Sequence, residues 1–279
     1  MDSLIKLENF ALIPPFAELF QQGVIVTVLL SVFTVLIGFV LAVVLALMRL
    51  SNFHPFYFLG LTKDGHLRDG GILLALSRFN PLSFLATTYV EVLRSTPVIV
   101  QIMIVYLGVF SVIELPNFTF LGFIKFNRFF PGVVALGMNS GAYLCEIIRS
   151  GIQSVDGGQS EAARSLGMSQ AQTLRFIILP QAVRNILPAL GNEFIMMLKE
   201  TSLASTFFLG DLMTSYSIVK GVTYLTLEPM TIVAIIYLCM TFPLSKIVER
   251  FEKKMASPNS YKAHSRKGKK RAQKLGIDQ

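Results

Sequence analysis

Charged residues interrupt three apolar runs of this chain, at Glu91 and Arg94, at Glu146 and Arg149, and at Lys199 and Glu200. In the first two clusters the acid and the base are three residues apart, so both lie on one face of a helix and can pair. An ionised group at the centre of a bilayer costs about 2.5–3.5 kcal/mol, so such groups face a partner or a watery cavity. Together the clusters offer the cation and the anion that a small zwitterionic ligand needs.

Two interpretations of these clusters remain open. The charges can form ion pairs that only fix the register of neighbouring helices, or they can line a polar path. Adjacent helical positions point about 100° apart, so Lys199 and Glu200 cannot easily satisfy each other, which favours the second interpretation for them. Asn139 and Thr201 add uncharged polar groups, although such residues often only form hydrogen bonds between helices.

The sequence shows no catalytic constellation. It lacks the phosphate-binding pattern GxxxxGK[ST], so we expect the chain to bind no nucleotide by that route. The three histidines, His54, His66 and His264, share no spacing, and Cys145 and Cys239 lie in apolar runs as packing residues do. We therefore predict no catalytic residue, no metal and no cofactor in this chain.

The composition is that of a membrane protein. The chain is 53% hydrophobic and 15% charged, with a mean hydropathy of +0.59, whereas soluble domains carry roughly 25% charged residues. Residues 23–48 contain no charge and exceed the about 20 residues that a span requires. We predict an all-α polytopic membrane protein with about five transmembrane helices. The expected spans are residues 23–48, 81–111 with a kink at Pro97, 129–148, a run beginning near Asn185, and 230–247.

The distribution of Lys and Arg predicts the orientation. The segment 49–78 holds four, 149–184 holds four and the chain from Lys246 onward holds eleven, against one before the first span and two in 112–130. Because cytoplasmic loops carry the excess of Lys and Arg, we expect the N-terminus outside and the C-terminus in the cytoplasm of a cell or inner membrane.

The segment 157–180 is polar and lies between apolar runs on the predicted cytoplasmic side. We expect a first short helix over 160–166, ended by Gly167, which tolerates the left-handed cap. Ser169 starts a second helical piece with Gln172 as its capping-box partner, and Pro180 is expected to break the helix at the end of the segment.

An apolar ridge is predicted on this helix–turn–helix. Its members are Ala162, Ala163, Leu166 and Met168. A loop that docks into a groove on another protein would need such a ridge, whereas the alternative is a surface hairpin that only satisfies its own backbone.

This segment resembles the EAA loop of ABC importer permeases. The matching residues are Glu161, Ala162, Ala163 and Gly167, followed by Ile178, Leu179 and Pro180. In that family the loop is a coupling helix that binds the ATPase subunit. The resemblance therefore implies an ATPase contact formed by Glu161, Ala162, Ala163, Leu166, Gly167 and Met168.

Three more segments, 88–101, 143–153 and 199–203, resemble permeases of the histidine/glutamine/arginine type of polar amino-acid importer. The resemblance implies alternating access, ABC ATPase subunits that hold ATP and Mg, a second permease copy or a related chain, and an extracytoplasmic amino-acid-binding protein. For an amino-acid substrate, the substrate-pathway candidates are polar and charged residues inside the predicted spans: Glu91, Arg94, Asn139, Glu146, Lys199, Glu200 and Thr201. The loop 51–78, which is long for the family, and the basic tail depart from it.

The expected organisation has three parts. Residues 1–22 form an extracytoplasmic segment, residues 23–250 the transmembrane domain, and residues 251–279 a basic cytoplasmic tail. The tail has too few apolar residues to fold alone. Contact with anionic membrane lipid, rather than nucleic acid, explains its charge.

Two other classes of function fit the sequence less well. An ion- or proton-coupled secondary transporter would act without an ATPase, but such folds commonly contain inverted repeats, and we see no repeat here. A membrane sensor or scaffold that transports nothing would not need charges in three spans.

Overall fold

The computed structural model describes residues 7–51, 53–60 and 70–255, which form two compact units. The first comprises Met1–Arg149 and Glu193–Thr241, and the second comprises Ser150–Asn192 and Phe242–Gln279. The basic tail beyond Met255, the middle of the 51–78 loop with His66, and residues 1–6 lie outside the described residues.

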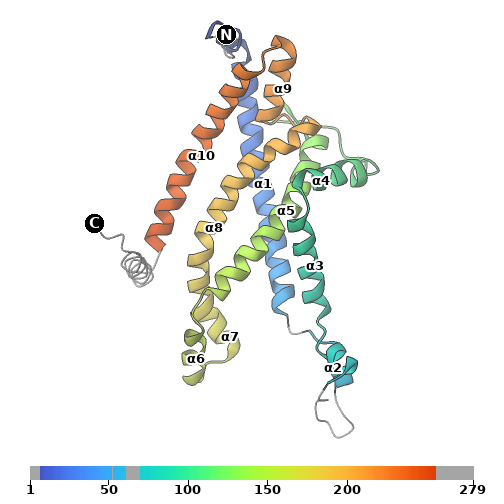
Figure 1. The fold of residues 1–279 in the computed structure, drawn as a ribbon, viewed down its shortest axis with the longest axis vertical. Helices are drawn as coiled ribbons and strands as arrows, with labels where there is room; N and C mark the ends of the chain where they lie inside the picture. The colour runs from blue at the N-terminus through green and yellow to red at the C-terminus, as the bar shows by residue number, and fades with distance from the viewer. Residues whose placement is uncertain (1–6, 52, 61–69, 256–279) are drawn as a thin grey trace, which may run out of the picture. The chain divides into compact units, whose positions relative to one another are not determined.

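Helices make up most of the described chain (Figure 1). The long α-helices are α1 (Ala17–Leu50), α3 (Pro81–Ser95), α5 (Phe126–Gln153), α8 (Leu179–Glu200), α9 (Leu212–Thr223) and α10 (Leu227–Met255). The short α-helices are α2 (Ile72–Ser77), α4 (Val98–Met103), α6 (Gly157–Ser165) and α7 (Gln170–Thr173). The 3-10 segments are η1 (Leu7–Leu12), η2 (Pro14–Phe16), η3 (Tyr57–Gly60) and η6 (Thr201–Phe207), while η4 (Ile104–Val109) and η5 (Leu174–Ile178) are π-helical. The strands β1 (Thr119–Phe120) and β2 (Ile124–Lys125) pair antiparallel.

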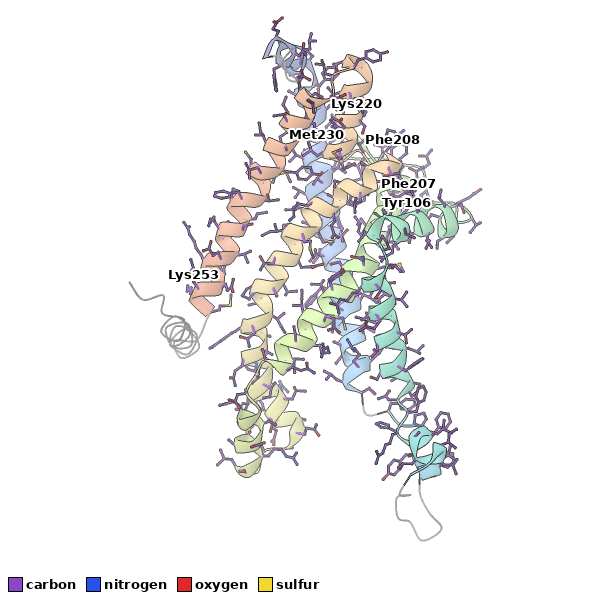
Figure 2. The ribbon with its side chains drawn as sticks, viewed as in Figure 1. Tyr106, Phe207, Phe208, Lys220, Met230 and Lys253 are labelled. Carbon is purple, nitrogen blue, oxygen red and sulfur yellow. The ribbon has the colours of Figure 1, made fainter. Side chains whose placement is uncertain are left out.

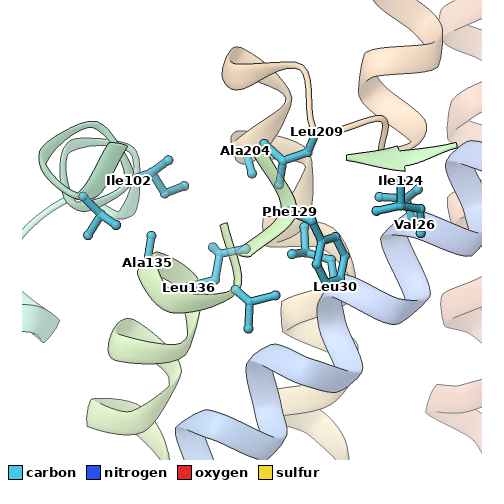
Figure 3. Packing of buried hydrophobic residues seen from close by; sticks show 11 residues of the cluster. Val26, Leu30, Ile102, Ile124, Phe129, Ala135, Leu136, Ala204 and Leu209 are labelled. Carbon is cyan, nitrogen blue, oxygen red and sulfur yellow. The ribbon is translucent and has the colours of Figure 1, made fainter. Parts of the chain in front are cut away.

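The core of the first unit is apolar and is built around α1 and α5. Figure 3 shows Leu30 of α1 beside Phe129 of α5, Val26 of α1 beside Ile124, and Ile102 of α4 on the side of Ala135. Tyr106 of η4 stacks on Phe207 of η6, with ring centroids 4.1 Å apart (Figure 2). This contact fastens η4, which follows α4, to η6, which follows α8.

Small residues let α1 and α5 approach closely. A Cβ added to Gly38 would lie 3.0 Å from Ser140 Cβ and 3.1 Å from the backbone N of Gly141. A Cβ on Gly141 would lie 2.8 Å from Leu41 Cδ2. Glycine at these positions allows the close backbone packing on which helix association in membranes depends.

The second predicted span is divided rather than only kinked. After Ser95 the chain turns through Pro97, and α3 and the helix Val98–Val109 are bent by 110°. Proline lacks a backbone N–H and its ring clashes with the preceding turn, so it kinks or breaks a helix, and at Pro97 the helix is broken. The prediction of one run over 81–111 is therefore corrected to two helices that meet at a break.

The all-α membrane fold is confirmed. Within the described residues, Pro14–Leu50 and Leu227–Met255 are long and apolar enough to cross a membrane, and the bent pair makes a third candidate. The polar helices α5 and α8 contain 28 and 22 residues, or about 42 and 33 Å at 1.5 Å per residue, against a hydrocarbon core of about 30 Å. Three of the five predicted spans thus have a candidate helix, in α1, α10 and the bent pair, while α5 and α8 are long enough and their crossing of the membrane stays a prediction.

Candidate functional site

Glu146 on α5 is the centre of a cluster of guanidinium groups in the first unit. Arg149 donates to it from Nη2 at 2.7 Å, Arg49 of α1 pairs with its Oε1, and Arg94 Nη1 of α3 lies 3.8 Å from Oε2. The side chains of Glu146 and Arg49 are each 16% exposed, so solvent screens their pairing only in part. The predicted Glu146–Arg149 pair is confirmed.

The predicted pairing of Glu91 with Arg94 is wrong. Arg94 is directed to Glu146, and its guanidinium carbon lies 5.4 Å from the ring centroid of Tyr143. In the described part of the chain, no ion pair joins it to Glu91, which is exposed. The fold brings Arg94 to α5, where its guanidinium approaches both Glu146 and the ring of Tyr143, and the i,i+3 spacing on α3 does not outweigh these contacts.

Asn139 belongs to a buried hydrogen-bond network at the break between α3 and α4. Gln101 Nε2 donates to the carbonyl of Leu93 at 2.7 Å, to the carbonyl of Thr96 at 3.0 Å and to Thr96 Oγ1 at 2.8 Å. Asn139 Nδ2 donates to Gln101 Oε1 at 3.0 Å, which links the network to α5. Among the described residues Asn139 Oδ1 is buried without a hydrogen-bond partner, so one acceptor remains open.

A buried carboxylate lies on α8. Glu193 is 3% exposed and accepts a hydrogen bond from Ser140 Oγ at 3.1 Å. Glu200, seven residues further along the same helix, is partly buried, and its Oε2 is buried with no hydrogen-bond partner within the described residues. Residues seven apart lie on one face of a helix, so α8 presents two acidic groups along one line.

The remaining candidates lie where α8 ends. Lys199 is exposed, and Thr201 is fully buried with its hydroxyl donating to the carbonyl of Leu198 at 2.9 Å. This bond uses the hydroxyl hydrogen of Thr201 and satisfies a carbonyl group at the end of α8. Lys199 and Glu200 differ in burial, as expected of neighbours on a helix.

In the second unit, residues 157–180 form the predicted helix–turn–helix. Gly167 has φ +82°, its N–H donates to the Arg164 carbonyl at 3.0 Å, and the Met168 N–H donates to the Ala163 carbonyl at 3.1 Å. These two bonds form a Schellman motif, which ends α6 at a left-handed glycine. Ser169 and Gln172 form the predicted capping box at the start of α7.

Two details of this hairpin differ from the prediction. Ala163 is buried, whereas Leu166 is 85% exposed, so the four apolar residues do not form one exposed ridge. Pro180 does not break the helix. The π-helix η5 leads directly into α8, and Pro180 lies in the first turn of α8. Proline is tolerated at that position, and Gln181 Nε2 donates to the Ile177 carbonyl at 2.9 Å.

Three residues of the polar site were not among the sequence candidates: Arg49, Gln101 and Glu193. Arg49 ends a long apolar run, and Glu193 lies inside one, so both carried the signal of a charge that must find a partner. Gln101 comes a few residues after Thr96-Pro97, where a broken helix leaves carbonyl groups to be satisfied.

The chain is similar to known transport proteins over most of its length. Residues 70–257 match the family described as binding-protein-dependent transport system inner membrane component. The chain is 34% identical over 249 residues to the arginine transport system permease protein ArtQ of Bacillus subtilis, covering 89% of this chain and 98% of that protein. It is 39% identical over 188 residues to a putative glutamine transport system permease protein GlnP of Rickettsia typhi, covering 66% of this chain and 82% of that protein.

Solved structures give the same picture. A crystal structure of an amino acid ABC transporter with histidines superposes with a TM-score of 0.72 at 39% identity, covering 88% of this chain and 98% of that one. An inward-facing MetNI methionine ABC transporter superposes with a TM-score of 0.63 over 88% of this chain and 99% of that one, at 17% identity, which shows the fold alone.

Proposed function

The chain belongs to the inner membrane components of binding-protein-dependent transport systems, and we propose that it is the membrane-spanning subunit of an ATP-driven importer of polar amino acids. It is a transport permease rather than an enzyme. In this proposal the spans form the translocation pathway, which opens to either side of the membrane in turn.

The amino-acid proposal rests on one observation: a chain whose relatives are named for amino acids has a polar site with groups of both charges. Relatives at 34% and 39% identity are named for arginine and for glutamine. In this chain Glu200 has an open buried carboxylate oxygen, and the exposed Lys199 beside it supplies a cation. An ammonium group could bind the first and a carboxylate the second. Asn139, with its open Oδ1, the exposed Glu91, and Arg94 with Glu146 would lie along the same path.

The proposed link to ATP hydrolysis is the hairpin α6–α7. Glu161, Ala162, Leu166 and Gly167 are exposed, and the Schellman motif and the capping box hold the turn in one conformation. A rigid, exposed helix end can transmit movement between subunits. ATP and Mg would be bound by separate ATPase subunits, which fits the lack of a phosphate-binding loop in the sequence.

The proposed assembly has further members. A second copy of this chain or a related permease completes the pathway, and an extracytoplasmic amino-acid-binding protein delivers the substrate. The excess of Lys and Arg favours an N-terminus outside and a hairpin and C-terminus in the cytoplasm.

The test is purification of the chain from its native membrane, followed by transport in proteoliposomes. We expect an ATPase subunit to co-purify, and labelled arginine or glutamine to accumulate only with ATP on the ATPase side and binding protein on the other. Uptake driven by a proton or sodium gradient without ATP would instead support a secondary transporter. Import of neither amino acid, with ATPase activity that other small solutes stimulate, would reject the substrate class and keep the importer.

A further inference from the structure

The segment between α1 and α3 exposes a cluster of large apolar side chains. We call residues 53–60 and 70–79 the aromatic segment; within it η3 and α2 pack against each other. Its exposed members are Phe53, Phe56, Tyr57, Phe58, Ile72, Leu76 and Phe79. Phe58 is 64% and Ile72 is 76% exposed, although soluble proteins rarely leave contiguous apolar patches of this kind in water.

The base of the aromatic segment is held at the ends of two membrane helices. Asn80 Nδ2 donates to the carbonyl of Ser51, the C-cap residue of α1. The same side chain caps α3 by accepting a hydrogen bond from the Ser83 N–H at 3.0 Å. One asparagine therefore joins the end of α1 to the start of α3, and the segment must begin and end at the surface of the bilayer.

The apolar surface of α1 continues into this segment. Val40, Val44, Leu47 and Leu50 are exposed, and they recur at intervals of three or four residues, so they form one face of the helix. This face runs toward Ser51 and is followed by Phe53. Only Ser51 and Asn52 separate the last apolar residue of this face from Phe53 in the sequence, so the apolar side chains resume directly beyond the end of α1.

The charge of the aromatic segment indicates the same partner. Arg78 is the one charged residue in the sequence of 53–60 and 70–79, and the intervening sequence 61–69 holds Lys63 and Arg68 against Asp64 and Asp69, so the stretch 53–79 has one more base than acids. Aromatic rings with few acidic neighbours are typical of the boundary between headgroups and acyl chains, where anionic lipids also attract basic side chains. We propose that the aromatic segment lies in the membrane interface and inserts its rings among the lipids of the leaflet where α1 ends.

The absence of tryptophan from the whole sequence allows a direct test. Phe58→Trp introduces one indole into the segment, and Tyr57→Trp is a second probe that exchanges one aromatic ring for another. Each is measured in the reconstituted importer, after subtraction of the wild-type signal, in lipids brominated either near the headgroup or near the ends of the acyl chains. Leu36→Trp, an exposed position near the middle of residues 23–48, serves as the deep control, and Leu166→Trp in the α6–α7 hairpin serves as the control outside lipid.

We expect Phe58→Trp to be quenched more by the shallow bromines than by the deep ones, and Leu36→Trp to show the opposite order. Leu166→Trp should respond to neither. The proposal is overturned if both segment probes ignore brominated lipid and are quenched by aqueous iodide, because the rings would then lie in water. It is equally overturned if they ignore both quenchers and become iodide-sensitive only when the ATPase is removed, since a protein would then cover the segment.

Discussion

Arg49, in the last turn of α1, forms an ion pair with Glu146 on α5. The same carboxylate accepts from Arg149 and lies 3.8 Å from Arg94, so one acid connects guanidinium groups from α1, α3 and α5. A cluster of this kind can hold helix ends together in one conformation and release them in another. Glu146 is the carboxylate toward which the three guanidinium groups converge.

Glu146→Gln should destabilise the permease and reduce uptake. The amide keeps the size of the side chain but leaves the arginines without a carboxylate, which costs about 1–3 kcal/mol when a partly buried charged hydrogen bond is lost. Thermal unfolding of the purified importer and uptake per transporter measure the effect. Glu249→Gln is the matched control, because Glu249 pairs with Lys246 and Lys253 on the exposed surface of α10 and such pairs contribute about 0–1 kcal/mol. Equal, small effects of the two substitutions on thermal unfolding and uptake would show that the cluster around Glu146 does not hold the helices together.

Gln101→Met should loosen the break between α3 and α4. Methionine is similar in volume, but it cannot donate to the carbonyls of Leu93 and Thr96 or accept from Asn139. Leaving such groups buried and unsatisfied costs about 1–3 kcal/mol each before relaxation. Thr96→Val removes only one of these partners, the hydroxyl, and should cost less. A melting temperature lowered more by Thr96→Val than by Gln101→Met would contradict the central role of Gln101.

The sequence predicted those features that depend on local pattern. The long apolar runs of α1 and α10, the left-handed Gly167 and the Ser169–Gln172 box all depend on neighbours within a few residues. The i,i+3 pair of Glu146 and Arg149 is of the same kind.

Features that depend on distant residues could not be obtained in this way. Arg94 has an acid three residues before it, but the folded chain brings Glu146 to it from another helix. Arg49 counts as a loop charge in the sequence, since nothing near it along the chain shows that α5 supplies its partner. The burial of Ala163 depends on how α6 packs, which an amphipathic pattern over nine residues does not determine.

Gly167→Leu should uncouple ATP hydrolysis from uptake while the protein still inserts. The backbone at Gly167 has φ +82°, a conformation that costs an L-residue roughly 1–2 kcal/mol, so the Schellman turn would be displaced. Gly157→Leu is the matched control, since Gly157 lies on the same hairpin, a Cβ there also meets open space, and its φ is not in the left-handed region. The ratio of ATP hydrolysed to substrate imported should rise for Gly167→Leu only. Normal transport by that variant, with unchanged ATPase activity, would remove the hairpin as the coupling element.

Lys199→Met should abolish most substrate-dependent transport without preventing insertion. Lys199 is exposed at the end of α8, and beside it Glu200 has a buried carboxylate oxygen with no hydrogen-bond partner among the described residues. Methionine keeps the apolar stem and removes the cation, so the site would lose its attraction for a substrate carboxylate. ATPase activity that no longer responds to substrate, together with normal membrane abundance, is the expected result.

Lys220→Met is the control, because Lys220 is an exposed lysine whose ammonium lies 6.0 Å from the ring centroid of Tyr216 on α9. The Lys220→Met variant should transport at the wild-type rate. If uptake falls in Lys199→Met but returns when Glu91 is also neutralised, Lys199 is a structural partner of Glu91 rather than a substrate ligand. Wild-type affinity and rate in the single variant would exclude both roles.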